Sequence, residues 1–241
     1  MAKRARRTKN QEHQDEGVIQ LNGMKRRQRY VTMIPKNLRQ EDYIEMLDDD
    51  RKYIVFAMGP AGTGKTLLAV LAAIRALKNG EIEKIVVTRP AVSVDEQHGF
   101  LPGDLKAKME PWTRPIFDFL EEHYDPKKVL QMVENKTIEI SPLAYMRGRT
   151  FKRAWIIADE MQNATQEQTK MLLTRIGEGS KIVVTGDLAQ HDRGFTNNGL
   201  ADFLNKYNTA SVNSIAHVQF EKRDVERHPV VADVLNIYDE A

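Results

Sequence analysis

The residues best suited to chemistry in this sequence form one run, residues 59–66, which reads GPAGTGKT. The run fits the pattern G-x-x-x-x-G-K-[S/T] at every fixed position. Its glycines let the backbone turn so that several amides converge on the oxygens of a polyphosphate. We expect Lys65 to contact the β- and γ-phosphates of ATP and Thr66 to place its hydroxyl on Mg²⁺. The alternative is a glycine-rich turn with an incidental lysine. The predicted nucleotide contacts of this run are Gly59, Pro60, Ala61, Gly62, Thr63, Gly64, Lys65, Thr66 and Leu67.

A pair of adjacent carboxylates, Asp159 and Glu160, follows the apolar run at 154–158. We expect Asp159 to hold Mg²⁺ through water and Glu160 to act as the general base that polarises the attacking water. Gln162, two positions after Glu160, could sense the γ-phosphate. The pattern is short, and it gains its weight from the complete phosphate loop earlier in the chain.

Polar residues follow a second apolar run, at 181–185. Asp187 and Gln190 are predicted to contact the γ-phosphate, and an Asp-capped turn is the alternative. Before the phosphate loop, Gln40 could read the edge of adenine with its amide, and Tyr43 could stack on the base. A surface Gln beside a core Tyr is the alternative for that pair.

After residue 30, cations could reach phosphates from three parts of the chain. Arg89 ends a predicted strand, the place where ligands of open α/β sheets bind. Four cations close together could grip phosphates or form a solvated turn: Arg147, Arg149, Lys152 and Arg153. Arg223 and Arg227 are candidates for an arginine finger, which stabilises charge on the γ-phosphoryl oxygens. An ion-pair face with Asp224 and Glu226 is the alternative.

Short apolar runs alternate with helical patterns along the chain, and this order must position the candidate residues. Buried strands are predicted over 53–58, 84–88, 137–140, 154–158, 181–185 and 215–220. Helices are predicted over 67–78, 104–135, 166–175 and 230–238. The alternation predicts an α/β fold, a single domain with a mostly parallel sheet and helices on both faces. The polar segment 91–103 is predicted to be a loop at the ligand edge of the sheet.

Composition sets limits on the class of protein. The chain has 241 residues and no cysteine, which excludes disulfides, thiolate catalysis and cysteine-ligated zinc. No apolar run approaches the ~20 residues of a membrane span, and the basic N-terminus lacks the apolar stretch of a secretory signal, so a cytoplasmic protein is expected. Residues 1–30 hold nine Lys and Arg against three acids. We expect a disordered arm there that binds nucleic-acid phosphates, or else a solubilising tail, ahead of an ATPase domain over 31–241.

Several stretches together resemble the PhoH-like family of ATPases, which are relatives of superfamily-one helicases. They are GPAGTGKT at Gly59, TRPAV at Thr88, HGFLPGDL at His98, SPLAYMRGRT at Ser141, IIADEMQNAT at Ile156, TGDLAQ at Thr185 and RDVERHP at Arg223. The resemblance implies a RecA-like parallel sheet, ATP with Mg²⁺, an ATPase linked to RNA unwinding, and ring-shaped oligomers, hexamers in particular. One departure is the sequence SVDE at 93–96, where the family usually has Glu-x-Gly-Glu.

Superfamily-one helicases close two RecA-like domains around each nucleotide, but this sequence holds a single phosphate loop. A neighbouring subunit would then supply the missing arginine. We therefore expect Arg227, or Arg223, to reach the ATP of the next subunit, and hydrolysis to depend on assembly. The first hypothesis is an oligomeric Mg-ATPase that acts on RNA or single-stranded DNA. Two alternatives stay open: a small-molecule kinase, and an ATP-switched nucleic-acid-binding module without helicase activity.

Overall fold

The computed structural model of this chain describes residues 31–90, 105–189, 198–227, 230–231 and 237. Several expectations from the sequence fall outside the described residues. They are the basic arm at 1–30, the loop at 91–103, Gln190, and most of the helix at 230–238.

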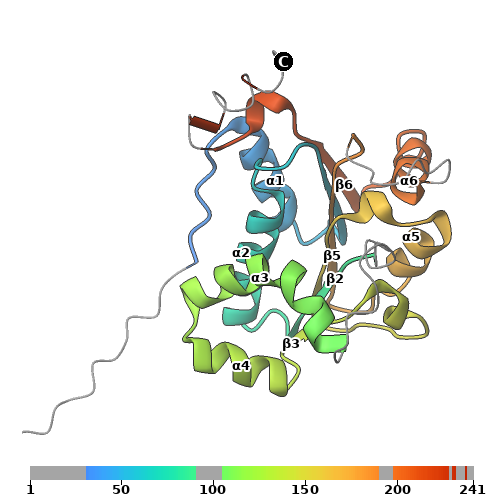
Figure 1. Ribbon diagram of the computed structural model, residues 1–241. Helices are drawn as coiled ribbons and strands as arrows, with labels where there is room; N and C mark the ends of the chain where they lie inside the picture. Colours follow the sequence, from blue (N-terminus) through green and yellow to red (C-terminus); the bar gives the residue numbers. More distant parts are fainter. Residues whose placement is uncertain (1–30, 91–104, 190–197, 228–229, 232–236, 238–241) are drawn as a thin grey trace, which may run out of the picture.

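A six-stranded sheet in the order β3-β2-β4-β5-β1-β6 forms the centre of the fold (Figure 1). Its strands are β1 (Ile54–Met58), β2 (Lys84–Thr88), β3 (Ile138–Ile140), β4 (Ala154–Ala158), β5 (Lys181–Gly186) and β6 (Ile215–Gln219). Every pairing in the sheet is parallel, so the carboxyl ends of all its strands lie along one edge. Each predicted strand is present, and the predicted α/β fold is confirmed.

Helices cover both faces of this sheet (Figure 1). On one face lie α1 (Leu38–Asp48), α2 (Lys65–Lys78), α3 (Leu105–His123) and α4 (Pro126–Glu134); on the other lie α5 (Gln166–Leu173) and α6 (Gly199–Tyr207). Short 3-10 turns complete the connections: η2 (Leu143–Met146), η3 (Met161–Asn163) and η4 (Lys222–Asp224). None of the helices in the described part of the chain has the length and apolarity needed to span a bilayer.

Side chains of each strand alternate between two hydrophobic cores. In β1, Val55 and Ala57 belong to the core beneath α1–α4, whereas Phe56 and Met58 belong to the core beneath α5 and α6. Phe56 stacks on Phe203 of α6, with ring centroids 5.0 Å apart. Because both faces are covered, β1 is buried along its whole length, as expected for a parallel sheet. This packed sheet holds the ends of β1, β4 and β5, where the candidate residues lie.

The helices differ from the prediction in two respects. The helical pattern at 104–135 forms two helices, because the Asp125 side chain caps α4 and Pro126 occupies its first turn. The sequence patterns do not predict α1 and α6. Their starts are fixed by Asn37 and Asn198, each of which accepts a backbone N–H with its side-chain oxygen. Of the two, α1 matters for the site because it carries Gln40.

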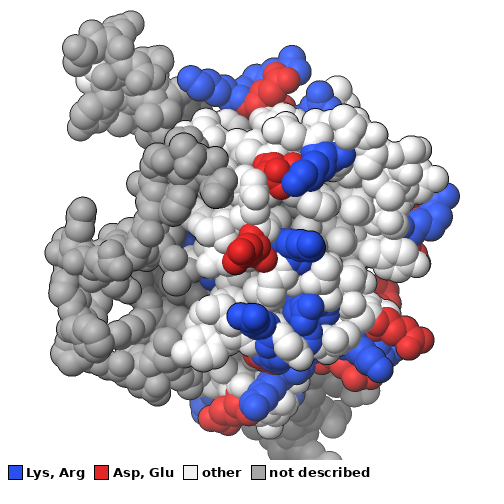
Figure 2. Space-filling view, turned by 90° about the vertical axis from the view of Figure 1, so that its right-hand side faces the viewer, with Lys and Arg blue, Asp and Glu red and all other residues white. Residues whose placement is uncertain are grey.

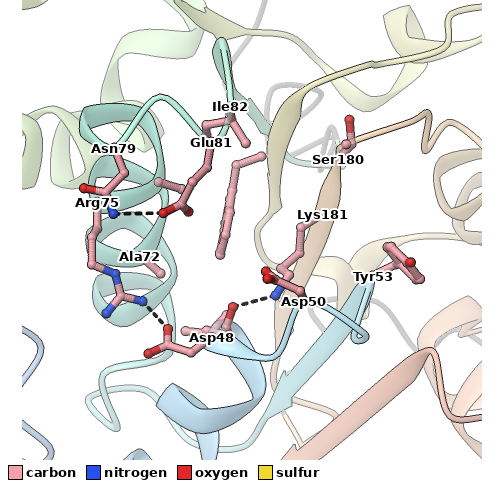
Figure 3. A pocket seen from close by; sticks show the side chains of 14 residues that line it. Asp48, Asp50, Tyr53, Ala72, Arg75, Asn79, Glu81, Ile82, Ser180 and Lys181 are labelled. Atoms are coloured by element: carbon pink, nitrogen blue, oxygen red, sulfur yellow. Dashed lines mark hydrogen bonds and ion pairs between the residues drawn. The ribbon is translucent and has the colours of Figure 1, made fainter.

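A hollow of about 740 Å³ lies at the amino-terminal edge of the sheet, between α1, α2 and the start of β5 (Figure 3). Lys181 on its wall is only 8% exposed. The Nζ atom of Lys181 donates to the carbonyls of Leu47 at 2.5 Å and Asp49 at 3.1 Å, and it lies 5.3 Å from the ring centroid of Trp155. These carbonyls end α1, so Lys181 caps that helix from β5 and holds it on the sheet.

Candidate functional site

The phosphate loop joins the end of β1 to the start of α2, as predicted. Gly59, Gly62 and Gly64 have φ angles of +134°, +86° and +83°, which favour glycine. A Cβ on Gly59 would lie 2.4 Å from the carbonyl oxygen of Phe220, so a larger residue does not fit there. Gly64 caps α2 without a side-chain hydrogen bond, which leaves the first amides of the helix and its positive end available to an anion.

Lys65 is the main cation of this loop. Its Nζ donates to two carbonyl oxygens of the loop, each at 2.6 Å. Burial lowers the pKa of Lys65, and the negative charges of Asp187, Glu160 and Asp159 oppose that shift. The ammonium therefore lies within electrostatic reach of the three carboxylates that the sequence places at this edge.

An oxygen cluster joins the loop to the end of β4. The hydroxyl of Thr66 donates to Oδ1 of Asp159 at 2.9 Å, and the hydroxyl of Thr185 on β5 donates to the same oxygen at 2.5 Å. Asp159 is 9% exposed, and its backbone N–H donates to the carbonyl of Thr88 at the end of β2. Hydroxyl and carboxylate oxygens are the ligands that Mg²⁺ prefers, so these residues fit the predicted metal.

Gln162 connects the second carboxylate to β5. Its Nε2 donates to Glu160 at 2.5 Å, and its Oε1 accepts the backbone N–H of Asp187 at 3.2 Å. Glu160 itself has a φ of +55°, a left-handed conformation that costs a residue with a Cβ about 1–2 kcal/mol. Strain of this kind clusters at functional sites. The Asp187 side chain also accepts the N–H of Ala189 at 3.0 Å, so the capped turn and the proximity to Lys65 occur together.

Gln40 lies beneath the phosphate loop and is only 4% exposed. Its Nε2 donates to the carbonyl of Thr63 at 3.1 Å, and its Oε1 accepts the N–H of Lys36 at 2.9 Å. A Cβ on Gly64 would lie 2.9 Å from this amide nitrogen. The Gln40 side chain thus supports the loop, and its contact with adenine stays a prediction.

Tyr43 is a core residue. It is fully buried and packs edge to face on Phe220, with ring centroids 5.9 Å apart. Its hydroxyl donates to the carbonyl of Lys65 at 3.3 Å, and burial raises the pKa of the phenol. The prediction that Tyr43 stacks on the base is wrong, because its ring has no exposed face. The alternative, a surface Gln beside a core Tyr, is right for Tyr43 but wrong for Gln40, which is buried.

The two candidate arginines occupy different positions. Arg223 forms an ion pair with Glu221 at 3.0 Å, and its side chain is 72% exposed. Arg227 lies against the phosphate loop of its own chain, where a Cβ on Gly62 would be 2.4 Å from the arginine Nε. Among the described residues, neither arginine forms the predicted ion-pair face with Asp224 and Glu226. Arg223 pairs with Glu221 instead, the buried Asp224 accepts the N–H of Glu221, and Glu226 accepts from Asn37.

Sequence reasoning missed two residues of the site. Thr185 holds the same oxygen of Asp159 as Thr66, and Asn37 caps the helix that carries Gln40. The available signals were a hydroxyl at the end of a predicted strand and an Asn three positions before Gln40. Neither signal says which other strand or helix lies beside it.

A sequence profile described as PhoH-like protein matches residues 32–239. A PhoH-like protein of Bacillus subtilis is 47% identical over 206 residues, which cover 85% of this chain and 63% of that protein. A PhoH-like protein of Synechocystis is 42% identical over 96% of this chain and 69% of its own length. Protein PhoH of Escherichia coli is 37% identical over 92% of this chain and 63% of its own length. The chain thus spans between 63% and 69% of these relatives.

Among solved structures, the SWI2/SNF2 ATPase core of Sulfolobus solfataricus in complex with double-stranded DNA and the Pif1 helicase of Candida albicans each give a TM-score of 0.41 at 16% identity. They cover 66% and 85% of this chain, and 33% and 44% of their own chains. A likeness of this degree adds nothing to the assignment. The profile match, in contrast, spans almost all of the sequence. It shows that the chain belongs to the PhoH-like protein family.

Proposed function

We propose that this chain hydrolyses ATP in a Mg²⁺-dependent reaction and couples hydrolysis to nucleic acid, RNA in particular, within a ring-shaped oligomer. The observation that carries the proposal is the 2.9 Å hydrogen bond between Thr66 and Asp159. It brings the end of the phosphate loop against the end of β4, so that phosphate-binding amides, metal-binding oxygens and a further carboxylate, Glu160, lie in one place.

Each residue has a role that its position supports. Lys65 and the loop amides hold the β- and γ-phosphates. Thr66 and Asp159 hold the metal ion, which when bound neutralises charge on the phosphates. Glu160 accepts a proton from the attacking water. Gln162, bonded to Glu160 and to the end of β5, is placed to respond to loss of the γ-phosphate. Glu160 as a base for water is also what separates a hydrolase from a kinase.

A groove between η2 and α5 supports the nucleic-acid part of the proposal. Figure 2 shows this face of the molecule, where Lys and Arg side chains gather in the lower half. The groove has a volume of about 470 Å³, and its cations are Arg147, Lys170 and Arg175. Tyr145, two positions before Arg147, is 62% exposed. Exposed aromatic rings beside cations are typical of surfaces that bind single strands, because bases stack on the rings and phosphates pair with the cations.

Of the four clustered cations that could grip phosphates or form a solvated turn, Arg149 and Arg153 form ion pairs. Arg147 and the exposed Lys152 form none among the described residues. Arg149 pairs with Glu139 at 2.5 Å, and Arg153 pairs with Glu83 at 2.6 Å. In the described part of the chain, Arg147 has no carboxylate within ion-pair distance, and neither has Lys170. Arg147 and Lys170 line the groove and are therefore the cations that we assign to nucleic-acid phosphates.

The first test is ATP hydrolysis by the wild type and by Glu160→Gln. The amide keeps the size of the side chain but cannot accept the proton, so turnover should fall about 100-fold or more while ATP affinity is kept. Lys65→Ala should lose ATP binding itself. Equal turnover in the wild type and Glu160→Gln would contradict the proposal that this site hydrolyses ATP. The alternative, an ATP-switched binding module, would then remain.

The second test measures the same hydrolysis with single-stranded RNA, single-stranded DNA or neither. RNA should stimulate the wild type, and the double variant Arg147→Glu/Lys170→Glu should lose the stimulation but keep the basal rate. Arg51→Glu, an exposed arginine paired with Asp49 elsewhere on the surface, is the matched control. Removal of residues 1–30 should reduce the salt dependence of RNA binding. If neither RNA nor DNA stimulates ATP hydrolysis by the wild type, the proposed coupling is contradicted. Analytical ultracentrifugation, which measures the number of subunits, tests the proposed hexamer.

A further inference from the structure

We propose that Arg227 binds the phosphates of the nucleotide held by its own chain. The inference rests on the proposed nucleotide site. It gives Arg227 a different role from the one that the sequence suggests, which is to reach the ATP of a neighbouring subunit.

The Arg227 side chain runs across the exposed part of the phosphate loop. A Cβ built on Gly62 would lie 2.4 Å from Nε, 3.1 Å from Cγ and 3.2 Å from Cδ of Arg227. The arginine therefore fills the space that a larger residue would need at this position. Gly62 belongs to the turn whose amides converge on a polyphosphate, so the guanidinium group starts at the rim of the phosphate site.

The backbone that carries Arg227 is attached to the same site at two points. The N–H of Phe220 donates to the carbonyl of Met58 at 2.7 Å, immediately before the loop. The N–H of Glu226 donates to the carbonyl of Gly62 at 2.9 Å, within the loop. These two bonds hold the segment that carries Arg227 beside the loop of its own chain.

Asn37 adds a third attachment. Its Nδ2 donates to the carbonyl of Asp224 at 3.3 Å and to the carboxylate of Glu226 at 3.2 Å. Its Oδ1 accepts the N–H of Gln40, whose side chain in turn donates to the carbonyl of Thr63. The C-terminal segment and Gln40 thus hold the loop from two sides and are joined through Asn37.

The charges around Arg227 favour an anion as its partner. Among the described residues, no carboxylate lies within ion-pair distance of its guanidinium group, whereas Arg223 on the same segment pairs with Glu221. The adjacent carboxylate of Glu226 accepts from Asn37 instead. A guanidinium group presents its N–H donors in a planar fork that matches phosphate oxygens. The phosphates of a nucleoside triphosphate in the loop are the anion that this position serves.

The direct test is the affinity of the full chain for a fluorescent ATP analogue. Arg227→Ala should weaken binding about tenfold or more, Arg227→Lys should restore part of the loss, and Lys222→Ala, a cation on the same segment, should bind as the wild type does. Because Arg227 is exposed, the melting temperature without nucleotide should not change. Wild-type affinity in Arg227→Ala would overturn the inference. Failure of the wild type to bind the analogue would instead overturn the proposed function.

A second test separates the same subunit from a neighbouring one. Lys65→Ala and Arg227→Ala chains carrying different tags are co-expressed, and mixed oligomers are purified through both tags. If each site uses its own Arg227, no site in the mixture is complete and ATPase activity stays at the level of the single variants. Recovered activity would show that the arginine acts on a neighbouring subunit and would overturn the inference. Mixed oligomers of wild type and Lys65→Ala, which retain complete sites in either case, are the control.

Discussion

A single carboxylate oxygen joins three segments of the candidate site through hydrogen bonds. Oδ1 of Asp159 accepts the hydroxyls of Thr66 and Thr185, so the phosphate loop, β4 and β5 meet at one atom. Hydrogen bonds to a charged acceptor stabilise a fold more than neutral ones do. This geometry fixes the carboxylate without a metal ion, so the proposed Mg²⁺ would require little further ordering of Asp159.

Thr185→Val should destabilise the protein by about 1–2 kcal/mol. Valine keeps the shape of the side chain but removes one of the two hydroxyl groups that donate hydrogen bonds to Asp159. The matched control is Thr88→Val. Thr88 is equally buried at the end of β2, but its hydroxyl has no hydrogen-bond partner among the described residues, so its loss should cost nothing measurable. Urea denaturation without nucleotide measures both. Equal losses in the two variants would show that the bond to Asp159 contributes nothing.

The sequence could predict single residues of the site where a fixed spacing within one segment imposes the chemistry. Lys65 and Thr66 follow from the glycine pattern, and Asp159 and Glu160 follow from the end of an apolar run. The bond from Thr185 could not be predicted, because it depends on the lateral order of β4 and β5. The place of Arg227 depends on where the chain returns after β6, which is equally invisible in a local pattern.

At the scale of elements, the contact between α5 and α6 leaves no space at Gly199. A Cβ there would lie 2.3 Å from the backbone oxygen of Thr165 and 2.5 Å from the hydroxyl of Thr169. Alanine in place of glycine favours a helix by about 1 kcal/mol, but an overlap with backbone of this size costs more. The steric overlap therefore outweighs the gain in helix propensity, and the substitution should lower the free energy of unfolding.

Gly199→Ala should lower the free energy of unfolding by about 1–3 kcal/mol and separate α6 from the start of α5. The comparison is Gly80→Ala, where a Cβ would meet nothing within 4 Å and the cost, about 1 kcal/mol, comes from the positive φ alone. Denaturant titrations of both variants test this order. A Gly199→Ala protein as stable as the wild type would show that α6 can shift without loss.

The strands could be predicted because a parallel sheet covered on both faces needs continuous apolar runs, and β1, β4 and β5 are buried throughout. The helix α1 could not. Its buried residues are Gln40, Tyr43 and Leu47, and a polar member breaks the apolar pattern that would reveal a helix. Gln40 is buried there because its side chain donates a hydrogen bond to the phosphate loop. The same contact with the candidate site therefore explains why α1 lacks the apolar pattern of a helix.

For the molecule as a whole, His217 should make the fold sensitive to mild acid. It lies on the edge strand β6, opposite Phe56, and its Nε2 is buried without a partner among the described residues. Burial lowers its pKa below the usual 6.5, so the unfolded chain takes up the proton more readily than the folded one. By linkage, stability is unaffected above pH 6.5, falls as the pH drops from 6.5 to the lowered pKa, and then levels off.

His217→Leu should therefore match the wild type near neutral pH and be less destabilised below pH 6.5. Melting temperatures of both proteins across this range measure the difference. If the two curves stay parallel, His217 does not account for the acid sensitivity of the fold.

The place of β1 in the sheet has a consequence for synthesis of the protein. The phosphate loop follows β1, yet the partners of Ile54 in that strand are Ile182 and Ile215, which come much later in the chain. On the ribosome, the glycine-rich loop emerges long before either neighbouring strand exists, and pairing over such separations is slow. A nascent chain therefore lacks the two strands, β5 and β6, that flank β1 and hold this loop in the finished sheet. Under the proposed function, ATP would protect only the finished domain from proteolysis, and not the intermediates through which it forms.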